Sequence, residues 1–230
     1  MRDLIIVGAS GMGREVCDLC RMMPQHGSEW EVRGFLDTRP GILEGLGDWP
    51  PILGSPFDYT VRPQELFICA VGDSYYRLRI SEFLRAKGAE FATLLHPNTY
   101  RASHTRIGEG GILYNGAGLG PNVTVGDFVF LNEYTGVGHD SVVGEGTTIG
   151  PHTCIGGWAR IGRGVYIGSH ATILPRAVVE DYAYVGAGSV VLRRVAARSK
   201  VFGNPAVRIG RVDIPENWEE QLAHGGKDDA

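Results

Sequence analysis

Two neighbouring residues, His139 and Asp140, could act together as a general base and the group that orients it. An imidazole can take a proton from an attacking amine or hydroxyl, and an adjacent carboxylate can fix the tautomer whose free nitrogen faces a substrate. Eighteen residues on stand Gly156 and Gly157, where no side chain shields the backbone amide. A base beside an exposed N–H is the minimum requirement for acyl transfer, because that N–H can receive the developing oxyanion. The alternative interpretation of His139 is a surface histidine that caps a turn, and spacing alone does not decide between the two.

A six-residue repeat positions these groups. From Ile107 to about Val195 the chain repeats without a break in units of six residues, here called hexads. Each of the fifteen hexads begins with an aliphatic residue, has a small or β-branched fifth residue, and in ten hexads has glycine second. Such self-similarity is typical of a solenoid, whereas apolar residues six apart drift around an α-helix.

The period predicts a triangular prism. A hexad supplies one short strand and a turn, roughly 20 Å of extended chain, so three hexads close one coil. First-position aliphatic residues then point inward and stack on those eighteen residues later, which predicts about five coils with a continuous core. We expect the second-position glycines to adopt backbone angles that a Cβ would forbid. His139, third in its hexad, then lies at a corner or outer face, one coil from Gly157, and any site lies outside the filled core or between subunits.

The first 97 residues predict a separate, Rossmann-like α/β domain. Strands are expected at 3–7, 32–37, 52–53, 66–71 and 91–95, with helices from 11 to about 23 and at 74–87. A strand, a glycine-rich turn and a helix start can present N–H groups to a phosphate, although a tight turn without a ligand is the alternative. The glycine spacing G-x-x-G-x-G and the single mononucleotide half favour a nucleotide or nucleotide-sugar over NAD. The residues predicted to bind it are Gly8, Ser10, Gly11, Met12, Gly13, Asp37, Gly72 and Asp73.

The amino-acid composition argues against several classes of partner. The 230 residues are 43% hydrophobic with a net charge of −4, which does not suggest a nucleic-acid partner. No apolar run approaches the ~20 residues of a membrane span, and the N-terminus lacks a cleavable signal pattern, so we expect a cytoplasmic protein without a membrane partner. Four scattered cysteines suggest reduced thiols and no metal centre. His152 and His170, eighteen residues apart, are expected to stack on adjacent coils as turn or interface residues.

The chain resembles the hexapeptide-repeat sugar acyltransferases that carry an N-terminal α/β cap. The resemblance rests on four stretches: residues 8–13, residues 72–73, Gly138-His139-Asp140-Ser141-Val142-Val143-Gly144, and Gly203-Asn204-Pro205-Ala206. Two branches of the family fit, the nucleotide-4-amino-sugar N-acetyltransferases of the bacillosamine type and the sialic acid O-acetyltransferases. The resemblance implies a left-handed parallel β-helix, a homotrimer, and acetyl-CoA bound in the groove between two β-helices.

The resemblance also implies roles for individual residues. His139 is then the general base, Asp140 orients it, and Gly157 gives its amide to the acetyl carbonyl. Thr148 stands where bacillosamine-type enzymes often have a second histidine near the thioester, and Met12 where relatives frequently have histidine. The expected partners of the coenzyme's phosphates and adenine end, with a solvated edge as the alternative for the basic residues, are Arg193, Arg194, Lys200, Asn204 and Pro205.

These observations predict an acetyl-CoA-dependent N-acetyltransferase acting on a nucleotide-linked amino sugar, without a metal. The alternatives are O-acetylation of a sugar by the same groups and a non-catalytic trimeric scaffold that binds a nucleotide-sugar. The predicted domains are residues 1–97, the β-helix at 98–211, and a tail at 212–230 with a short helix near 218–222. We expect residues 201–208 to leave the β-helix as a loop.

Overall fold

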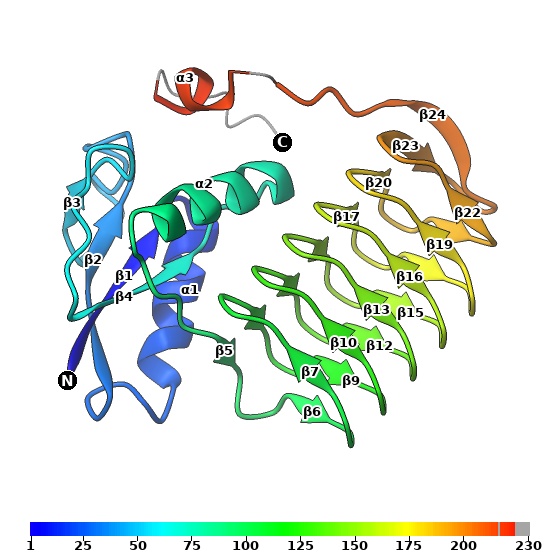
Figure 1. Ribbon diagram of the computed structural model, residues 1–230, viewed down its shortest axis with the longest axis horizontal. Helices are drawn as coiled ribbons and strands as arrows, with labels where there is room; N and C mark the ends of the chain where they lie inside the picture. Colours follow the sequence, from blue (N-terminus) through cyan, green and yellow to red (C-terminus); the bar gives the residue numbers. More distant parts are fainter. Residues whose placement is uncertain (216, 224–230) are drawn as a thin grey trace. The chain divides into compact units, whose positions relative to one another are not determined.

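The computed structural model describes residues 1–215 and 217–223 (Figure 1). The chain divides into two compact units. The sheet unit comprises residues 1–72, 79–92 and the segment from Ile214, and the coil unit comprises residues 73–78 and 93–213. The division differs from the expected boundaries because residues 73–78 group with the coils, and because residues 214–215 and 217–223 group with the sheet unit. Residue 216 and residues 224–230 of the expected tail lie outside the described residues.

The sheet unit is a small parallel α/β structure. Its four strands have the order β3-β2-β1-β4, and the central strand β1 carries four consecutive buried residues at its carboxyl end. This continuous apolar run is what a parallel strand covered on both faces requires. The strands and helices are β1 Arg2–Val7, α1 Gly11–Met22, β2 Trp30–Leu36, β3 Ile52–Gly54, β4 Glu65–Cys69, α2 Ser74–Ala86 and α3 Trp218–Ala223.

These elements confirm the predicted strands and helices, with one exception. The strand expected at 91–95 does not join this sheet: Phe91 makes only an isolated bridge to Phe67, and Leu94–Leu95 belongs to the coils as β5. In α3, Trp218 is buried and packs near Phe57 and Phe83, with ring centroids 6.0 and 6.3 Å apart. This contact explains why the C-terminal segment groups with the sheet unit.

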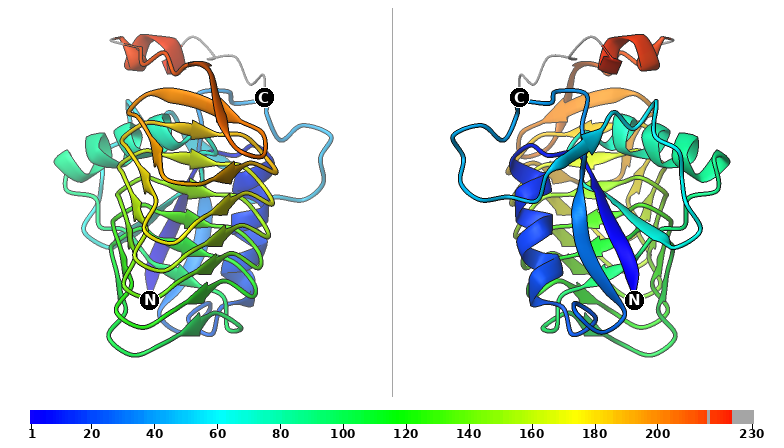
Figure 2. Two further views of the ribbon diagram at one scale, coloured as in Figure 1. Left: turned by 90° about the vertical axis from the view of Figure 1, so that its right-hand side faces the viewer. Right: turned by 90° about the vertical axis from the view of Figure 1, so that its left-hand side faces the viewer.

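The coil unit is a parallel β-helix, as the repeat predicted, and it is left-handed, as the resemblance implied. Figure 2 shows its coils stacked one on another, and three sheets of short strands, parallel except for the final strand β24, form its sides. One sheet runs β22-β19-β16-β13-β10-β7, one β21-β18-β15-β12-β9-β6, and one β24-β23-β20-β17-β14-β11-β8-β5. The core consists of the predicted inward residues, which are buried from Leu113 to Val195.

Each short strand spans two residues, except the last two. The strand bounds are β5 Leu94–Leu95, β6 Tyr100–Arg101, β7 Arg106–Ile107, β8 Ile112–Leu113, β9 Gly118–Leu119, β10 Thr124–Val125, β11 Phe130–Leu131, β12 Gly136–Val137, β13 Val142–Val143, β14 Thr148–Ile149, β15 Cys154–Ile155, β16 Arg160–Ile161, β17 Tyr166–Ile167, β18 Thr172–Ile173, β19 Val178–Val179, β20 Tyr184–Val185, β21 Val190–Val191, β22 Arg194–Val195, β23 Ser199–Phe202 and β24 Val207–Arg211.

The expected role of the second-position glycines is wrong. Their backbone is not left-handed; the left-handed residue is the fourth of the hexad, as at Asp140 (φ 57°) and Trp158 (φ 64°). The second position needs glycine because the next coil passes very close: a Cβ on Gly138 would lie 2.6 Å from the Gly157 nitrogen. Close stacking of coils, and not an unusual φ, therefore selects glycine there.

The end of the β-helix also differs from the prediction. Val179 pairs with Val195 and Val185 with Val201, so the last coil is two residues shorter than the eighteen of the preceding ones. Val195 thus takes a strand position, not the fifth position of a hexad. Residues 201–208 do not leave the β-helix as one loop: β23 continues a sheet, buries Val201 in the core and pairs with the antiparallel β24, and residues 203–206 form the turn between these two strands.

Candidate active site

His139 and Asp140 form the turn between β12 and β13, at a corner of the prism. Asp140 takes the left-handed backbone of this corner, and His139 projects outward with 55% of its side chain exposed. The His139 Nδ1 lies 2.7 Å from Asp140 Oδ2. Because a carboxylate oxygen only accepts, Nδ1 carries the proton in the neutral ring and Nε2 is left as the basic nitrogen. The predicted contact between His139 and Asp140 is therefore present.

Asp140 is itself held in place from the adjacent coils. Asn122 Nδ2 donates to its other oxygen at 3.0 Å, and the Arg160 guanidinium donates to its backbone carbonyl at 2.7 Å. The hydrogen bonds from His139 and Asn122, with the nearby charge of Arg160, lower the pKa of Asp140 from its ordinary value. The carboxylate therefore stays ionised and keeps its hold on the imidazole at neutral pH.

Gly157 lies directly against the imidazole. A Cβ on this residue would lie 2.6 Å from His139 Nε2, so only glycine lets the ring take its position. Within the described part of the chain, the Gly157 N–H donates no hydrogen bond. Beneath the turn, the Ser141 hydroxyl donates to the Gly156 carbonyl at 3.0 Å and accepts from the Ala159 N–H at 3.1 Å, which ties the two coils together. A basic nitrogen and an available amide thus lie side by side.

Sequence reasoning missed three residues of this corner. Asn122, Trp158 and Arg176 share the fourth hexad position with Asp140 and lie on neighbouring coils. The Trp158 ring lies 6.4 Å from the imidazole at 90°, and the Arg176 guanidinium carbon lies 5.5 Å from the centre of the indole. The eighteen-residue spacing from Asp140 could have identified all three, because each coil repeats the same corner.

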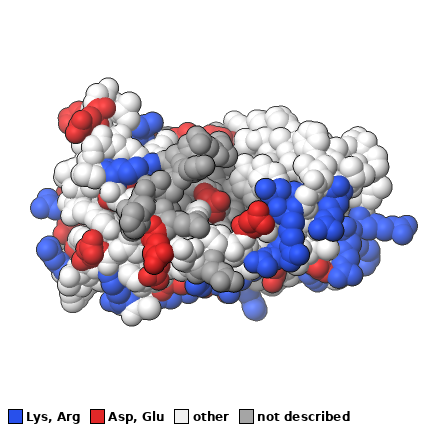
Figure 3. Space-filling view, turned by 90° about the horizontal axis from the view of Figure 1, so that it is seen from above, with Lys and Arg blue, Asp and Glu red and all other residues white. Residues whose placement is uncertain are grey.

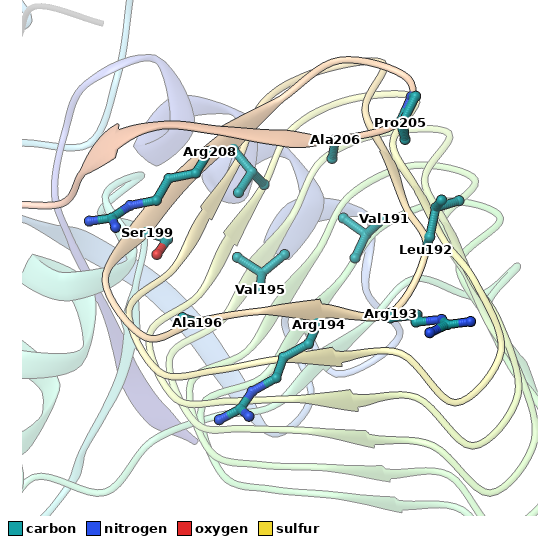
Figure 4. A pocket seen from close by; sticks show the side chains of 11 residues that line it. Val191, Leu192, Arg193, Arg194, Val195, Ala196, Ser199, Pro205, Ala206 and Arg208 are labelled. Atoms are coloured by element: carbon teal, nitrogen blue, oxygen red, sulfur yellow. The ribbon is translucent and has the colours of Figure 1, made fainter.

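The residues expected at the coenzyme's phosphates surround a cavity at the end of the coil unit. Arg193, Arg194 and Pro205 line this cavity of about 550 Å³ together with Arg208, and its other lining residues include Val191, Val195 and Ser199 (Figure 4). Figure 3 shows Lys and Arg side chains gathered over these last coils. Arg194 is paired with Glu180, whose pKa is lowered by the Ala197 N–H and by Arg194. Asn204 does not line the cavity.

Lys200 does not line this cavity, although its neighbours in β23, Ser199 and Val201, do.

Thr148 has surroundings that argue against contact with the coenzyme. It is only 5% exposed, because the first turn of α2 covers it. Its hydroxyl oxygen accepts from Arg77 Nη2 at 2.7 Å and lies 2.8 Å from the Ser74 hydroxyl. Thr148 is also on β14, whereas His139 lies at the corner between two other sheets. We therefore correct the expectation that Thr148 replaces a histidine at the thioester.

The glycine turn of the sheet unit has the predicted form. Gly8 is left-handed (φ 95°), Ser10 precedes the first turn of α1, and a Cβ on Gly13 would lie 2.1 Å from the Gly8 carbonyl oxygen. Gly11 has open space where a Cβ would be, and the Met12 sulfur lies 3.9 Å from the corresponding position on Gly72. The structure thus brings the predicted residues of the turn and Gly72 together.

Asp37 and Asp73, the two acids expected to bind the nucleotide, already accept hydrogen bonds from other groups of the protein. Asp37 is 7% exposed, and its carboxylate accepts from the Ala9 N–H at 2.9 Å and from the backbone and guanidinium of Arg39. It lies beside the glycine turn as predicted, but a ligand would have to displace Arg39. Asp73 belongs to the coil unit and accepts from the N–H groups of Tyr75 and Tyr76, which caps α2.

The other described histidines and the four cysteines form no metal centre. His152 and His170 stack as predicted, with ring centroids 5.0 Å apart. The four cysteines are free, and only Cys154 is exposed. Within residues 1–215 and 217–223, no group of three or more His, Cys, Asp or Glu side chains is arranged to hold a metal ion. The helices of this same part are all too short or too polar for a bilayer crossing.

Known proteins share both units. Residues 3–84 match the family model of the PglD N-terminal domain, and residues 122–157 and 159–193 match that of the bacterial transferase hexapeptide. The chain is 28% identical over 116 residues to UDP-N-acetylbacillosamine N-acetyltransferase of Bacillus subtilis (strain 168), which covers 49% of this chain and 51% of the relative. The chain therefore spans about half the length of this curated relative in the match.

A solved structure resembles nearly the whole chain. The acetyltransferase domain of PglB from Neisseria gonorrhoeae FA1090 has a TM-score of 0.82 at 28% identity, with 91% of this chain and all of that chain covered. The same domain in complex with acetyl coenzyme A gives a TM-score of 0.81 at 28% identity, with 90% of this chain and 99% of that chain covered. With the repeat, the N-terminal domain and the His139 corner in place, the chain belongs to the hexapeptide-repeat acyltransferases that carry a PglD-type N-terminal domain.

Proposed function

We propose that this protein transfers the acetyl group of acetyl-CoA to the amino group of a nucleotide-linked amino sugar. The observation that carries the proposal is the corner in which Asp140 contacts the His139 ring and Gly157 lies against that ring, with an N–H that donates no hydrogen bond within the described residues. The relative from Bacillus subtilis, whose name describes N-acetylation of a UDP-linked sugar, favours an amine over a hydroxyl acceptor.

In this reaction, His139 Nε2 removes a proton from the acceptor amine as its nitrogen attacks the thioester carbonyl carbon. The carbonyl oxygen gains negative charge and accepts a hydrogen bond from the Gly157 N–H. The carbon–sulfur bond then breaks, the electron pair leaves on sulfur, and the proton held by His139 passes to the thiolate. The products are the N-acetyl sugar nucleotide and CoA. Asp140 stabilises the imidazolium while it carries the proton.

The two units divide the work of binding. We assign the nucleotide to the sheet unit, where the turn from Gly8 to Gly13 offers N–H groups near the start of α1. We assign the phosphates of the coenzyme to the arginines at the end of the coil unit, because cations there offset several negative charges. We further propose a homotrimer in which a neighbouring β-helix closes the groove along the His139 corner, to be checked by light scattering after size-exclusion chromatography.

The test is an assay of thiol release from acetyl-CoA with a panel of UDP-, GDP-, dTDP- and CMP-linked amino sugars, followed by mass spectrometry of the product. We expect one 4-amino sugar nucleotide to gain an acetyl group on nitrogen, and His152→Ala to retain this activity as a matched histidine control. Acetylation of a hydroxyl would support the O-acetyltransferase alternative. Tight nucleotide binding without thiol release from any acceptor would contradict the proposal and support a scaffold.

A further inference from the structure

The Trp158 indole lies beside the catalytic corner and has no part in the chemistry described so far. It follows Gly157 in sequence, is 44% exposed, and meets the imidazole of His139 edge to face at a centroid distance of 6.4 Å. Large exposed aromatic side chains are frequent contact points for ligands, because they offer rigid apolar area with few rotatable bonds. Its place next to the amide that receives the acyl group makes it a candidate contact of a substrate.

The indole is fixed relative to the base. The backbone N–H of Trp158 donates to the His139 carbonyl at 2.9 Å, and the left-handed backbone of Trp158 (φ 64°) recurs at Asp140 and Arg176 on the same edge of the prism. On the next coil, the Arg176 N–H donates to the Gly157 carbonyl at 2.9 Å, and its guanidinium carbon lies 5.5 Å from the centre of the indole. A cation over an indole is the most favourable cation–π arrangement in proteins. The indole ring therefore forms one side of the site and is held in a fixed position.

The distribution of charge along this edge indicates which of the two substrates, the acyl donor or the acceptor, contacts Trp158. On the coils beyond Gly157, this edge holds Arg176 and then Arg193, and it ends at the cavity that Arg194 and Arg208 line. On the coil that precedes His139, the corner holds the uncharged residues Pro121 and Asn122. A donor with several phosphates, once its carbonyl lies at Gly157, must extend toward the arginines.

The dimensions agree with this direction. Neighbouring coils are about 4.8 Å apart, so Arg193, two coils beyond Gly157, lies roughly 10 Å along the edge. The chain between the thioester and the pyrophosphate of CoA contains about a dozen bonds and reaches about 15 Å when extended, estimated from standard bond lengths. That chain can span the distance, and on the way it passes the coil of Trp158.

We propose that Trp158 is a specificity-determining residue for the acyl donor, whose indole packs against the pantetheine arm next to the thioester. Arg176 is a positioning residue that holds the indole through its guanidinium. The inference rests on the proposed function, because it takes Gly157 as the site of the acetyl carbonyl. The methylene and dimethyl groups of pantetheine are the apolar parts that the indole contacts.

The proposal is tested with the full chain by calorimetric titration with CoA and by steady-state kinetics. Trp158→Ala should weaken CoA binding and raise the KM for acetyl-CoA about tenfold, as loss of a buried aromatic contact does, and Trp158→Phe should restore most of it. The KM for the acceptor should stay within about twofold. Arg176→Ala should raise the KM for acetyl-CoA with kcat retained, and Arg176→Lys should reverse this, since lysine also forms cation–π contacts.

An unchanged CoA affinity in Trp158→Ala would overturn the proposal, and so would an increase in the acceptor KM in place of the donor KM. Failure of the wild-type protein to bind CoA would overturn the proposed function itself. The two failures are distinguishable because the first is measured against a wild-type protein that binds CoA. Thermal melting of each variant shows that the fold is retained.

Discussion

At the scale of single residues, one carboxylate determines what the imidazole can do. Asp140 holds the His139 Nδ1–H at 2.7 Å and is itself held by Asn122 at 3.0 Å. An orienting acid contributes by keeping the base in the productive tautomer and by stabilising the imidazolium, not by taking the proton. In the proposed mechanism, the chain Asn122–Asp140–His139 leaves Nε2 as the atom that takes the proton.

Replacing Asp140 by asparagine tests this chain. The amide can present its N–H₂ to Nδ1 and so favour the wrong tautomer, and we expect kcat to fall by about 10²-fold or more, in line with orienting acids elsewhere. Steady-state kinetics with acetyl-CoA and the acceptor measures the change. Asn122→Ala, which removes only the outer hydrogen bond, should cost much less. An Asp140→Asn enzyme with kcat within twofold of the wild type would exclude the orienting role.

Asp140 also predicts a pH dependence of stability. Its pKa in the folded protein is lowered from its ordinary value of 3.8, so its interactions stabilise the fold above about pH 3.8 and are lost as the pH falls toward the lowered pKa. The wild type should therefore melt at a higher temperature than Asp140→Asn at pH 7, and this difference should shrink below about pH 3.8. Thermal melts of both proteins at several pH values provide the comparison. A difference that grows on acidification would contradict the direction of the shift.

At the scale of elements, the stacking of coils positions the site. Gly138 and Gly157 occupy successive coils where backbone passes backbone, and the imidazole fits because the upper residue has no Cβ. The positions of the site thus repeat at the eighteen-residue period of the core. The same strands that bury the aliphatic residues set the distance between base and amide.

Gly157→Ala should therefore damage catalysis without unfolding the protein. The new Cβ would lie 2.6 Å from His139 Nε2 and force the ring away from its place. We expect kcat/KM to fall by about 10²-fold or more, as displacement of a base or an oxyanion donor does. Gly118→Ala is the matched control, because its Cβ would have no atom within 4 Å. Equal activity of the two variants would show that the close contact at Gly157 is unimportant.

At the scale of the whole chain, each unit is built from segments that lie far apart in sequence. The sheet unit includes Trp218 from the C-terminal segment, which packs on Phe57 and Phe83 and lies 5.5 Å below the Arg79 guanidinium carbon. The coil unit includes the first turn of α2, where buried Arg77 donates to the carbonyls of Phe128 and Gly146. Segments far apart in sequence thus complete each core.

Trp218→Ala tests this division. Removal of a buried tryptophan should destabilise its surroundings by about 3 kcal/mol or more. Hydrogen exchange read by mass spectrometry should then show lost protection in peptides of residues 1–72 and 79–92, with the peptides of the coils from Ile107 to Val195 unchanged. Ile149→Ala, in the coil core, should give the opposite pattern. Loss of protection in both units from Trp218→Ala alone would show that they are not separate.

Most of the fold could be predicted from the sequence, because the six-residue period can be read directly from the aliphatic residues of the repeat. The inward residues, the corner at His139 and the stacked His152 and His170 all follow from that period. The repeat could not show that the last coil is two residues short, since Val195 and Val201 are aliphatic in either register. It also could not show that Thr148 is covered, because the covering residue, Arg77, is 71 positions away. Non-local packing, and not local pattern, determined these details.

The most direct test of the account is the rate of thiol release from acetyl-CoA by His139→Ala, with both substrates saturating and the fold verified by its melting curve. The mechanism predicts a loss of about 10²–10⁴-fold in kcat, the range that general base catalysis contributes. A rate within a few-fold of the wild type would contradict it, because the imidazole would then not be the group that removes the proton.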